Sequence, residues 1–481
     1  MKKLLYVILA SFILFSCKDA LIEAPKSLAV ETFYNTPAEV EAAIAAIYSP
    51  LRDGGCMGGL YPTQLECYTD YGYGRGSHAM LSNFQGLDGT NQTKTDGFWG
   101  YFYLSIRNAN IVIVNTPKGT KLTPADTCKY IAEAKFLRAF AYFTMVRNWG
   151  GVPVRTEKNM TIQNIKRNTV DEVYQLIYSD LKFAEENLPD NAPLAGKPSK
   201  WSAKTLLADV YFNQGKNAEA RDKAKEVILS NKYSLIPVTT ADDYSKIFGP
   251  EVITTSEEIF YLKFSRLGNS LGFAYLMYLN HPGTKYYGGG GYYTVYSSTD
   301  NSVIASWDKK DLRYSLWYSY NIGLGANTIL TKKFIDPLAP NANGGGNDYP
   351  LYRYADVLLM YAEADCRASG APSADAIEKL NMVHRRAYGK NPTIADTSVD
   401  FKLTDYNKDT FNDLVLRERG FETQFEGKRW LDLKRTGKVK EIILAATGKV
   451  VADKHLLWPI PVSELNYNSA IDPTKDQNPG Y

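Results

Sequence analysis

The sequence predicts a mainly α-helical protein whose scaffold consists of helix pairs like those of tetratricopeptide repeats, with long irregular loops and a few short strands. Three observations support this prediction. Apolar residues recur with a helical period before residue 233 and again after residue 348. Residues 197–228 have the pattern of a helical hairpin with small residues where its helices cross. Residues 54–100 and 286–296 are rich in glycine and tyrosine and lack a helical period.

The first residues have the parts of a lipoprotein signal peptide. Two lysines precede an apolar run at residues 4–15, which is too short to span a bilayer comfortably. Ser16 and Cys17 follow, and the Cys17 thiol would carry the lipid. We therefore expect residues 1–16 to be removed and residues 17–30 to form a lipidated tether, with more than one acyl chain for stable anchoring. An ordinary signal peptide with an incidental cysteine is the alternative.

Helices are expected to begin directly after this tether. Thr36 is the predicted N-cap of the first, with Pro37 at the first helical position and Glu39 three residues after the cap. Further helices are expected at residues 101–115, within 130–154 and at 169–189.

The hairpin at residues 197–228 has the clearest pattern. Its predicted contacts are Ala203, Leu207 and Tyr211 on the first helix against Ala220, Ala224 and Val227 on the second. Such pairs bury their apolar faces only by stacking on neighbours, so a right-handed array is expected. An unrelated helical bundle is the alternative.

The chain is expected to form one compact unit with two regions. Residues 31–250 would form the N-terminal helical region, and residues 251–481 the C-terminal region with the aromatic loops. In the second region, residues 256–265 alternate like a strand, while four consecutive glycines at 288–291 exclude a helix. Helices are expected again from residue 349, and the proline-rich residues 457–465 are expected as extended chain. Cys56, Cys67, Cys128 and Cys366 could form disulfides, but no connectivity follows from their positions.

Residues 411–437 combine charged and aromatic side chains on a predicted helix and its continuation. Glu418, Glu422 and Glu426 are spaced four residues apart, and like charges at this spacing repel. Each carboxylate is therefore expected to have a cation from elsewhere in the fold. We favour a structural network of ion pairs, with an acid/base cluster as the alternative.

The balance of charges limits the classes of partner. The chain has 481 residues, and its 55 Lys and Arg nearly offset 52 Asp and Glu, which gives a net charge of +3. This balance argues against a polyanionic partner, so we expect no nucleic-acid binding. The unusual feature is 35 tyrosines with 7 tryptophans, many of them in glycine-rich segments. Amphipathic rings in loops are typical of a binding surface.

The aromatic loops are the candidate ligand site. A sugar has C–H groups on its ring faces and hydroxyls at its edge, so its site needs flat rings and planar hydrogen-bonding side chains. We expect both loops to build a shallow platform on one side of the scaffold. The predicted ligand-binding residues are Asp70, Tyr71, Tyr73, Arg75 and Trp99 from the first region and Tyr286, Tyr287, Tyr292, Tyr293, Tyr296 and Trp317 from the second. The alternative is that these side chains pack the loops onto the scaffold, and this applies most to Trp99.

No catalytic, metal or cofactor site is predicted. The four histidines are scattered without ligand spacing, so no zinc site is indicated. The glycines at 288–291 lack the Lys-Ser or Lys-Thr that follows in a phosphate-binding loop, and no GxSxG motif occurs.

Four motifs near the C-terminus resemble one family. They are RYADVLLMYAEA at 353–364, LRERGFE at 416–422, EGKRWLDLKRTG at 426–437 and LWPIPVSELNYN at 457–468. Together they resemble the signature of the SusD/RagB family, the nutrient-binding outer-membrane lipoproteins of Bacteroidetes. The resemblance extends over nearly all of the mature chain, although KDA after Cys17 is a shorter acidic run than is usual in the family.

This resemblance implies a SusD-like fold and a function without enzymatic activity or cofactor. The protein would be lipid-anchored in the outer membrane, facing the cell exterior. It would capture oligosaccharide or polysaccharide and deliver it to a TonB-dependent, SusC-like transporter. Two alternatives stay open: capture of a non-carbohydrate nutrient such as peptide, and a surface glycoside hydrolase.

Overall fold

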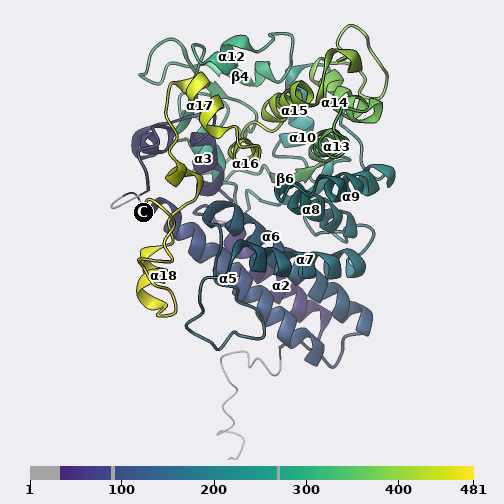
Figure 1. Ribbon diagram of the computed structural model, residues 1–481, viewed down its shortest axis with the longest axis vertical. Helices are drawn as coiled ribbons and strands as arrows, with labels where there is room; N and C mark the ends of the chain where they lie inside the picture. Colours follow the sequence, from purple (N-terminus) through teal and green to yellow (C-terminus); the bar gives the residue numbers. More distant parts are fainter. Residues whose placement is uncertain (1–32, 88–90, 92, 268–270) are drawn as a thin grey trace, which may run out of the picture.

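Helices packed against one another in chain order form the scaffold of the computed structural model (Figure 1). The structure describes residues 33–87, 91, 93–267 and 271–481, so the predicted signal peptide and the whole of the tether, with Cys17, lie outside the described residues. The first part of the scaffold comprises α2 (Pro37–Arg52), α5 (Thr93–Asn115), α6 (Pro124–Trp149), α7 (Val170–Asn187), α8 (Lys200–Asn213) and α9 (Asn217–Leu229). The prediction of a mainly α-helical protein with a few short strands is confirmed.

The array continues after an excursion of the chain. Helix α13 (Tyr354–Ser369) packs on α9, and α14 (Ala374–Ala387) and α15 (Lys408–Glu422) pack on α13. Shorter helices occupy the remaining segments: α3 (Leu60–Cys67), α4 (Ala79–Ser82), α10 (Ser245–Phe248), α11 (Tyr275–Leu279), α12 (Ser302–Ser306), α16 (Arg429–Arg435), α17 (Val439–Thr447) and α18 (Val462–Tyr467).

Local sequence accounts for where several helices begin. The Thr36 hydroxyl accepts a hydrogen bond from the backbone N–H of Glu39, and the Glu39 carboxylate accepts one from the backbone N–H of Thr36. Pro37 occupies the first helical position, where its missing N–H costs nothing. The predicted N-cap is confirmed, and Thr123 and Thr169 cap α6 and α7 in the same reciprocal way.

The predicted hairpin is also confirmed. It consists of α8 and α9, which pack against each other. Ala203 and Leu207 on α8 and Ala220, Ala224 and Val227 on α9 are all buried. Small side chains let the two helix axes approach closely, and the remaining apolar faces are covered by α7 and α13.

Residues 54–100 are more regular than the sequence predicted. They contain α3 and α4, and α5 begins at Thr93 rather than at Tyr101. Glycine disfavours helix, but Gly97 and Gly100 are exposed, and Phe98 and Trp99 on the same helical turns are buried. Burial of these two large rings outweighs the cost of the glycines.

The prediction of extended chain at residues 457–465 is partly wrong, because α18 begins at Val462. Pro459 and Pro461 lack the N–H that a helix interior needs, whereas a proline directly before the first helical residue is tolerated.

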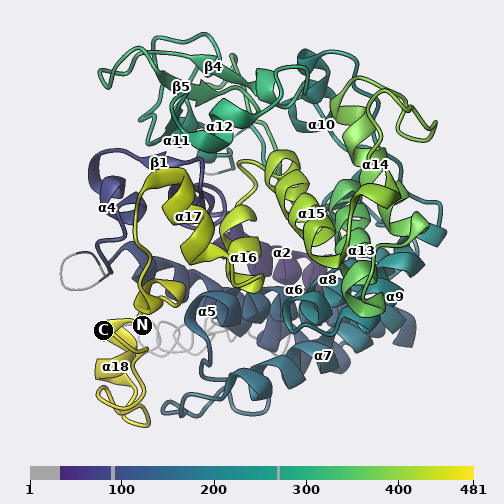
Figure 2. The same cartoon turned by 45° about the horizontal axis from the view of Figure 1, so that its top comes forward.

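Short strands form two sheets outside the helical array. The four-stranded sheet has the order β1 (Tyr73–Gly74), β3 (Val295–Ser298), β5 (Thr328–Thr331) and β4 (Trp317–Ser319). The predicted strand within residues 256–265 is β2 (Glu258–Leu262), which pairs with β6 (Tyr349–Arg353) and so returns the chain to the array at α13. Figure 2 shows β4, β5, α11 and α12 grouped at one end of the molecule, away from α7.

The four cysteines that the structure describes are free: Cys56, Cys67 and Cys366 are buried and Cys128 is exposed. Among the described residues, no helix combines the length and apolar character needed to cross a bilayer.

A buried network of ion pairs holds the end of α15 in place. Arg313 lies 2.8 Å from the Glu418 carboxylate, and Arg353 lies 2.6 Å from that of Glu422 and 2.7 Å from that of Glu426. Further contacts come from Lys333 to Glu426 at 2.6 Å and from Arg386 to Glu422. Each carboxylate thus has a cation from elsewhere in the fold, as predicted. The buried pairing supports the structural interpretation of this stretch over the acid/base alternative.

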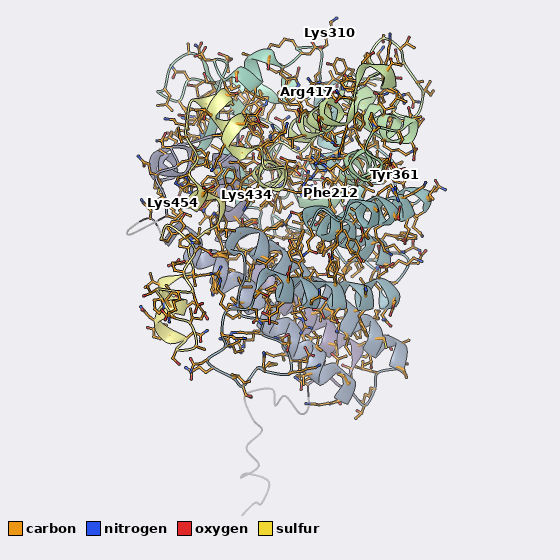
Figure 3. All side chains as sticks on the ribbon, in the orientation of Figure 1. Phe212, Lys310, Tyr361, Arg417, Lys434 and Lys454 are labelled. Atoms are coloured by element: carbon orange, nitrogen blue, oxygen red, sulfur yellow. The ribbon has the colours of Figure 1, made fainter. Side chains whose placement is uncertain are left out.

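The same stretch docks onto the first part of the scaffold through α16. The ammonium group of Lys434 donates hydrogen bonds to the carbonyl oxygens of Arg147 on α6 and of Leu456. The Arg435 guanidinium lies 3.7 Å from the ring centroid of Phe212 on α8. Lys434 and Phe212 are labelled at this junction in Figure 3.

Removing one charge of the network should be costly. We expect Glu422→Gln to lower the free energy of unfolding by about 3–5 kcal/mol, because Arg353 and Arg386 would each lose one carboxylate partner and the buried network would keep an uncompensated positive charge. Urea unfolding followed by circular dichroism measures this. The control is Glu219→Gln on α9, an exposed position where the change should stay within about 0.5 kcal/mol. Equal effects of the two substitutions would contradict the role of the network.

Acid should weaken the fold through the same carboxylates. Burial raises the pKa of Glu418, but the charge of Arg313 and the hydrogen bonds with Arg313 and His384 together outweigh it, so the pKa is lowered from 4.5 to about 2. The pKa values of Glu422 and Glu426 are lowered further, since Arg386, Arg353 and Lys333 also overcome the effect of burial. A carboxylate whose pKa is lower in the folded than in the unfolded protein stabilises the fold at pH values above its unfolded-state pKa. This stabilisation is lost as the pH falls towards the folded-state pKa. We therefore expect the free energy of unfolding to decrease from about pH 4.5 downward. Urea titrations at successive pH values test this, and an unchanged value from about pH 5 to about pH 3 would contradict it.

Candidate functional site

Strands β1 and β3 bring the two predicted loop regions together. They are antiparallel, with Tyr73 opposite Tyr296 and Gly74 opposite Val295. The rings of Tyr73 and Tyr296 have centroids 5.6 Å apart. The Tyr73 hydroxyl accepts a hydrogen bond from Asn301 Nδ2 at 2.9 Å. Two segments more than 200 residues apart thus form one surface.

A row of partly exposed side chains continues from this pair. The Arg75 guanidinium lies 3.8 Å from the Tyr293 ring centroid, and the His281 ring centroid lies 4.3 Å from that of Tyr293 and 4.7 Å from that of Tyr320. Tyr318 then contacts Tyr320 and Tyr286. We call this set the aromatic platform, and its members are Tyr73, Arg75, His281, Tyr286, Tyr293, Tyr296, Tyr318 and Tyr320, all half-buried.

A shallow hollow adjoins one end of the platform. Its volume is about 670 Å³, and Tyr73 and Tyr296 form part of its wall. Polar groups line much of the remainder, including Asp300, Asn301 and Asn327. Rings beside hydroxyl, amide and carboxylate groups can bind a sugar by both its faces and its edge.

Five predicted ligand residues are instead buried. Asp70 pairs with Arg429, and the Tyr71 hydroxyl donates to Glu66 at 2.8 Å. The Tyr287 hydroxyl donates to the carbonyl oxygens of Asn341 and Ala342. These contacts tie the three side chains to neighbouring segments of the fold.

Trp99 and Trp317 also lie apart from the platform surface. Trp99 on α5 packs edge to face on Trp149 and lines a separate groove of about 430 Å³. Trp317 is 6% exposed and packs on Tyr71 and Phe425. By contrast, Tyr292 is 62% exposed and lies near Tyr278 beside the platform.

Three members of the platform were not among the predicted ligand residues: His281, Tyr318 and Tyr320. Alternation along residues 317–320 could have identified the two tyrosines, because successive strand residues face opposite sides and Trp317 faces the core. No local pattern marks His281. Burial lowers its pKa and the charge of Arg75 lowers it further, which favours the neutral ring.

The charged groups around the platform do not form a metal centre. Within the described ranges, no three His, Cys, Asp or Glu side chains are grouped so that they could hold a metal ion.

Comparisons with known proteins agree with this architecture. The model of the SusD family matches residues 279–481, and a family model described as "Starch-binding associating with outer membrane" matches residues 32–212. SusD-like protein P2 of Formosa agariphila is 28% identical, with 97% of each chain covered. Starch-binding protein SusD of Bacteroides thetaiotaomicron is 23% identical over 75% of this chain and 74% of its own.

Solved structures have the same fold. A SusD homolog from Bacteroides thetaiotaomicron superposes with a TM-score of 0.80 at 22% identity, covering 94% of this chain and 98% of that one. A laminarin-binding SusD-like protein gives a TM-score of 0.73 at 23% identity, covering 92% and 99%. The helical scaffold therefore has the fold of SusD-like proteins. The two family models, which match separate parts of the chain, and the curated relatives together support a SusD-like family protein.

The burial of Trp317 predicts a structural role for it. We expect Trp317→Ala to lower the free energy of unfolding by about 3–5 kcal/mol, because a large cavity would remain beside Tyr71 and Phe425. Urea unfolding measures this loss. Tyr292→Ala is the matched control in the neighbouring loop, where high exposure predicts a change within about 0.5 kcal/mol. A stable Trp317→Ala protein would show that this ring does not support the platform.

Proposed function

We propose that this protein is a cell-surface lipoprotein that binds oligosaccharide or polysaccharide on the aromatic platform and delivers it to a TonB-dependent, SusC-like transporter. Lipidation of Cys17 would anchor it in the outer membrane, with the platform facing the cell exterior. Proteins of the SusD family bind nutrients rather than transform them, so we propose no catalytic activity for this chain.

The pairing of β1 with β3 is the observation that carries the proposal. It places Tyr73 beside Tyr296, and the row of rings continues through Tyr293. Each ring contact contributes on the order of 0.5–1.5 kcal/mol beyond the burial of area. Several weak contacts along one row suit a chain of sugar units, because they act together on one ligand.

The comparisons support each further part of the proposal to a different degree. One matching family model is described as starch-binding and as associating with the outer membrane. One structural relative is named as laminarin-binding, and another is a surface glycan-binding protein from Bacteroides fluxus. The transporter partner and the delivery step are proposed from the resemblance to the SusD family, and the lipid anchor is proposed from the sequence around Cys17.

Loss of platform rings should weaken glycan binding without unfolding the protein. We expect Tyr293→Ala and Tyr296→Ala each to weaken binding by about threefold to tenfold, since each removes one ring contact. Affinity electrophoresis of residues 18–481 against plant, host and microbial polysaccharides measures this. These residues contain every helix and strand that the structure describes.

The matched control is Tyr467→Ala on α18, which removes a tyrosine that is 81% exposed and lies outside the platform. It should leave retardation unchanged. Retardation that depends equally on all three tyrosines would reject the platform as the binding site. Release of reducing ends during incubation would support a hydrolase, and binding of peptides but no glycan would support peptide capture.

A further inference from the structure

Arg75 lies within the aromatic platform without a counter-ion. Its guanidinium stacks over Tyr293 at 3.8 Å, and its Nε is buried without a hydrogen-bond acceptor. In the part of the chain that the structure describes, no carboxylate forms an ion pair with it. By contrast, Arg138 and Arg313 each pair with an aspartate, at 2.7 and 2.6 Å.

The side chains nearest to Arg75 leave this charge uncompensated. Tyr293 and Tyr296 carry no carboxylate, and His281 beyond Tyr293 favours its neutral form because burial and the charge of Arg75 lower its pKa. Lys94, which donates to Ser77 Oγ at 3.1 Å, adds a second cation to the same loop region. Arg75 therefore gives the platform a positive charge that has no carboxylate partner among the described residues.

Two acidic groups around the platform have other partners. Asp70 is held by Arg429 beneath the platform. Asp300, in the hollow beyond Tyr296, accepts a hydrogen bond from Asn327 at 2.8 Å. Neither of them pairs with Arg75, so an anion that reaches this arginine would meet an unpaired donor group.

We propose that the platform selects glycans that carry an acidic sugar residue, with Arg75 binding its carboxylate or sulfate ester. The tyrosines beside it would stack on the same sugar or on its neighbours. This inference rests on the proposed glycan-binding function and specifies the class of ligand.

The geometry suits this role for two reasons. Stacking on Tyr293 fixes the plane of the guanidinium, so less entropy is lost when it binds. Its planar N–H groups match the two oxygens of a carboxylate or sulfate, and hydrogen bonds between charged groups are about twice as strong as neutral ones. A single contact between Arg75 and an acidic sugar acts at short range and does not require a strongly basic protein. The small net charge of +3 argues against a partner bound mainly through its total negative charge, so it does not argue against this contact.

Matched pairs of polysaccharides that differ in charge test the proposal. One pair is polygalacturonate and its methyl-esterified form, and the other is κ-carrageenan and its desulfated form. We expect residues 18–481 to bind the charged member of at least one pair about tenfold more tightly than the neutral member. The first pair reports on carboxylate and the second on sulfate, so the two sources of negative charge are distinguished.

Variants of one residue complete the test. Arg75→Gln should weaken binding of the charged member about tenfold more than it weakens binding of the neutral member. Arg75→Lys should retain part of the preference, because it keeps the charge but not the planar fork. The control is Arg417→Gln on α15, where a side chain that is 55% exposed lies outside the platform (Figure 3). Thermal unfolding of each variant checks that the fold is intact.

The outcomes separate this inference from the proposed function. Equal affinity for charged and neutral members, or an Arg75→Gln protein that keeps the preference, would overturn the selection of acidic sugars and leave glycan binding in place. No binding to any member of either pair or to the wider polysaccharide panel would overturn both.

Discussion

The buried pairing of three glutamates with cations from distant segments is the interaction on which the rest of the structure depends. Arg353 at the end of β6 contacts both Glu422 and Glu426, and Arg313 contacts Glu418. Arg313 precedes β4 and Lys333 follows β5, so the network holds the four-stranded sheet against the end of α15. Buried ion pairs add little net stability compared with apolar packing, but a missing partner is costly, which makes this arrangement specific.

The platform is a consequence of strand register. Tyr73 and Tyr296 lie on the same face because they are directly opposed in the β1–β3 ladder. A slip of one residue would turn them to opposite faces, since strand side chains alternate. The same alternation turns Trp317 into the core and leaves Tyr318 on the outer surface. Neighbouring aromatic residues in the sequence therefore have different roles: some hold the sheet on the scaffold, and others form its outer surface.

Features that depend on residues close together in the sequence could be predicted, whereas features that depend on contacts between distant segments could not. Thr36 and the α8–α9 hairpin could be predicted because capping and helical periodicity involve residues a few positions apart. Repulsion between the glutamates along the helix predicts that Glu422 needs a cation nearby. It does not predict that Arg353 and Arg386 are the residues that supply this cation. For the candidate site, composition indicated which loops are aromatic. It could not separate half-buried rings from buried ones, because burial depends on contacts between distant segments.

The sequence by itself determined the class of protein: helical periodicity, helix caps and four C-terminal motifs are local patterns, and together they indicated a SusD-like helical scaffold. The tertiary structure alone decided which aromatic side chains share a surface and which charges are neutralised. Arg75 illustrates the difference, because neither its stacking on Tyr293 nor its lack of a carboxylate partner within the described residues is visible in the chain order. Both properties arise where β1 meets β3, and a pairing of segments this far apart is set by the packing of the whole fold.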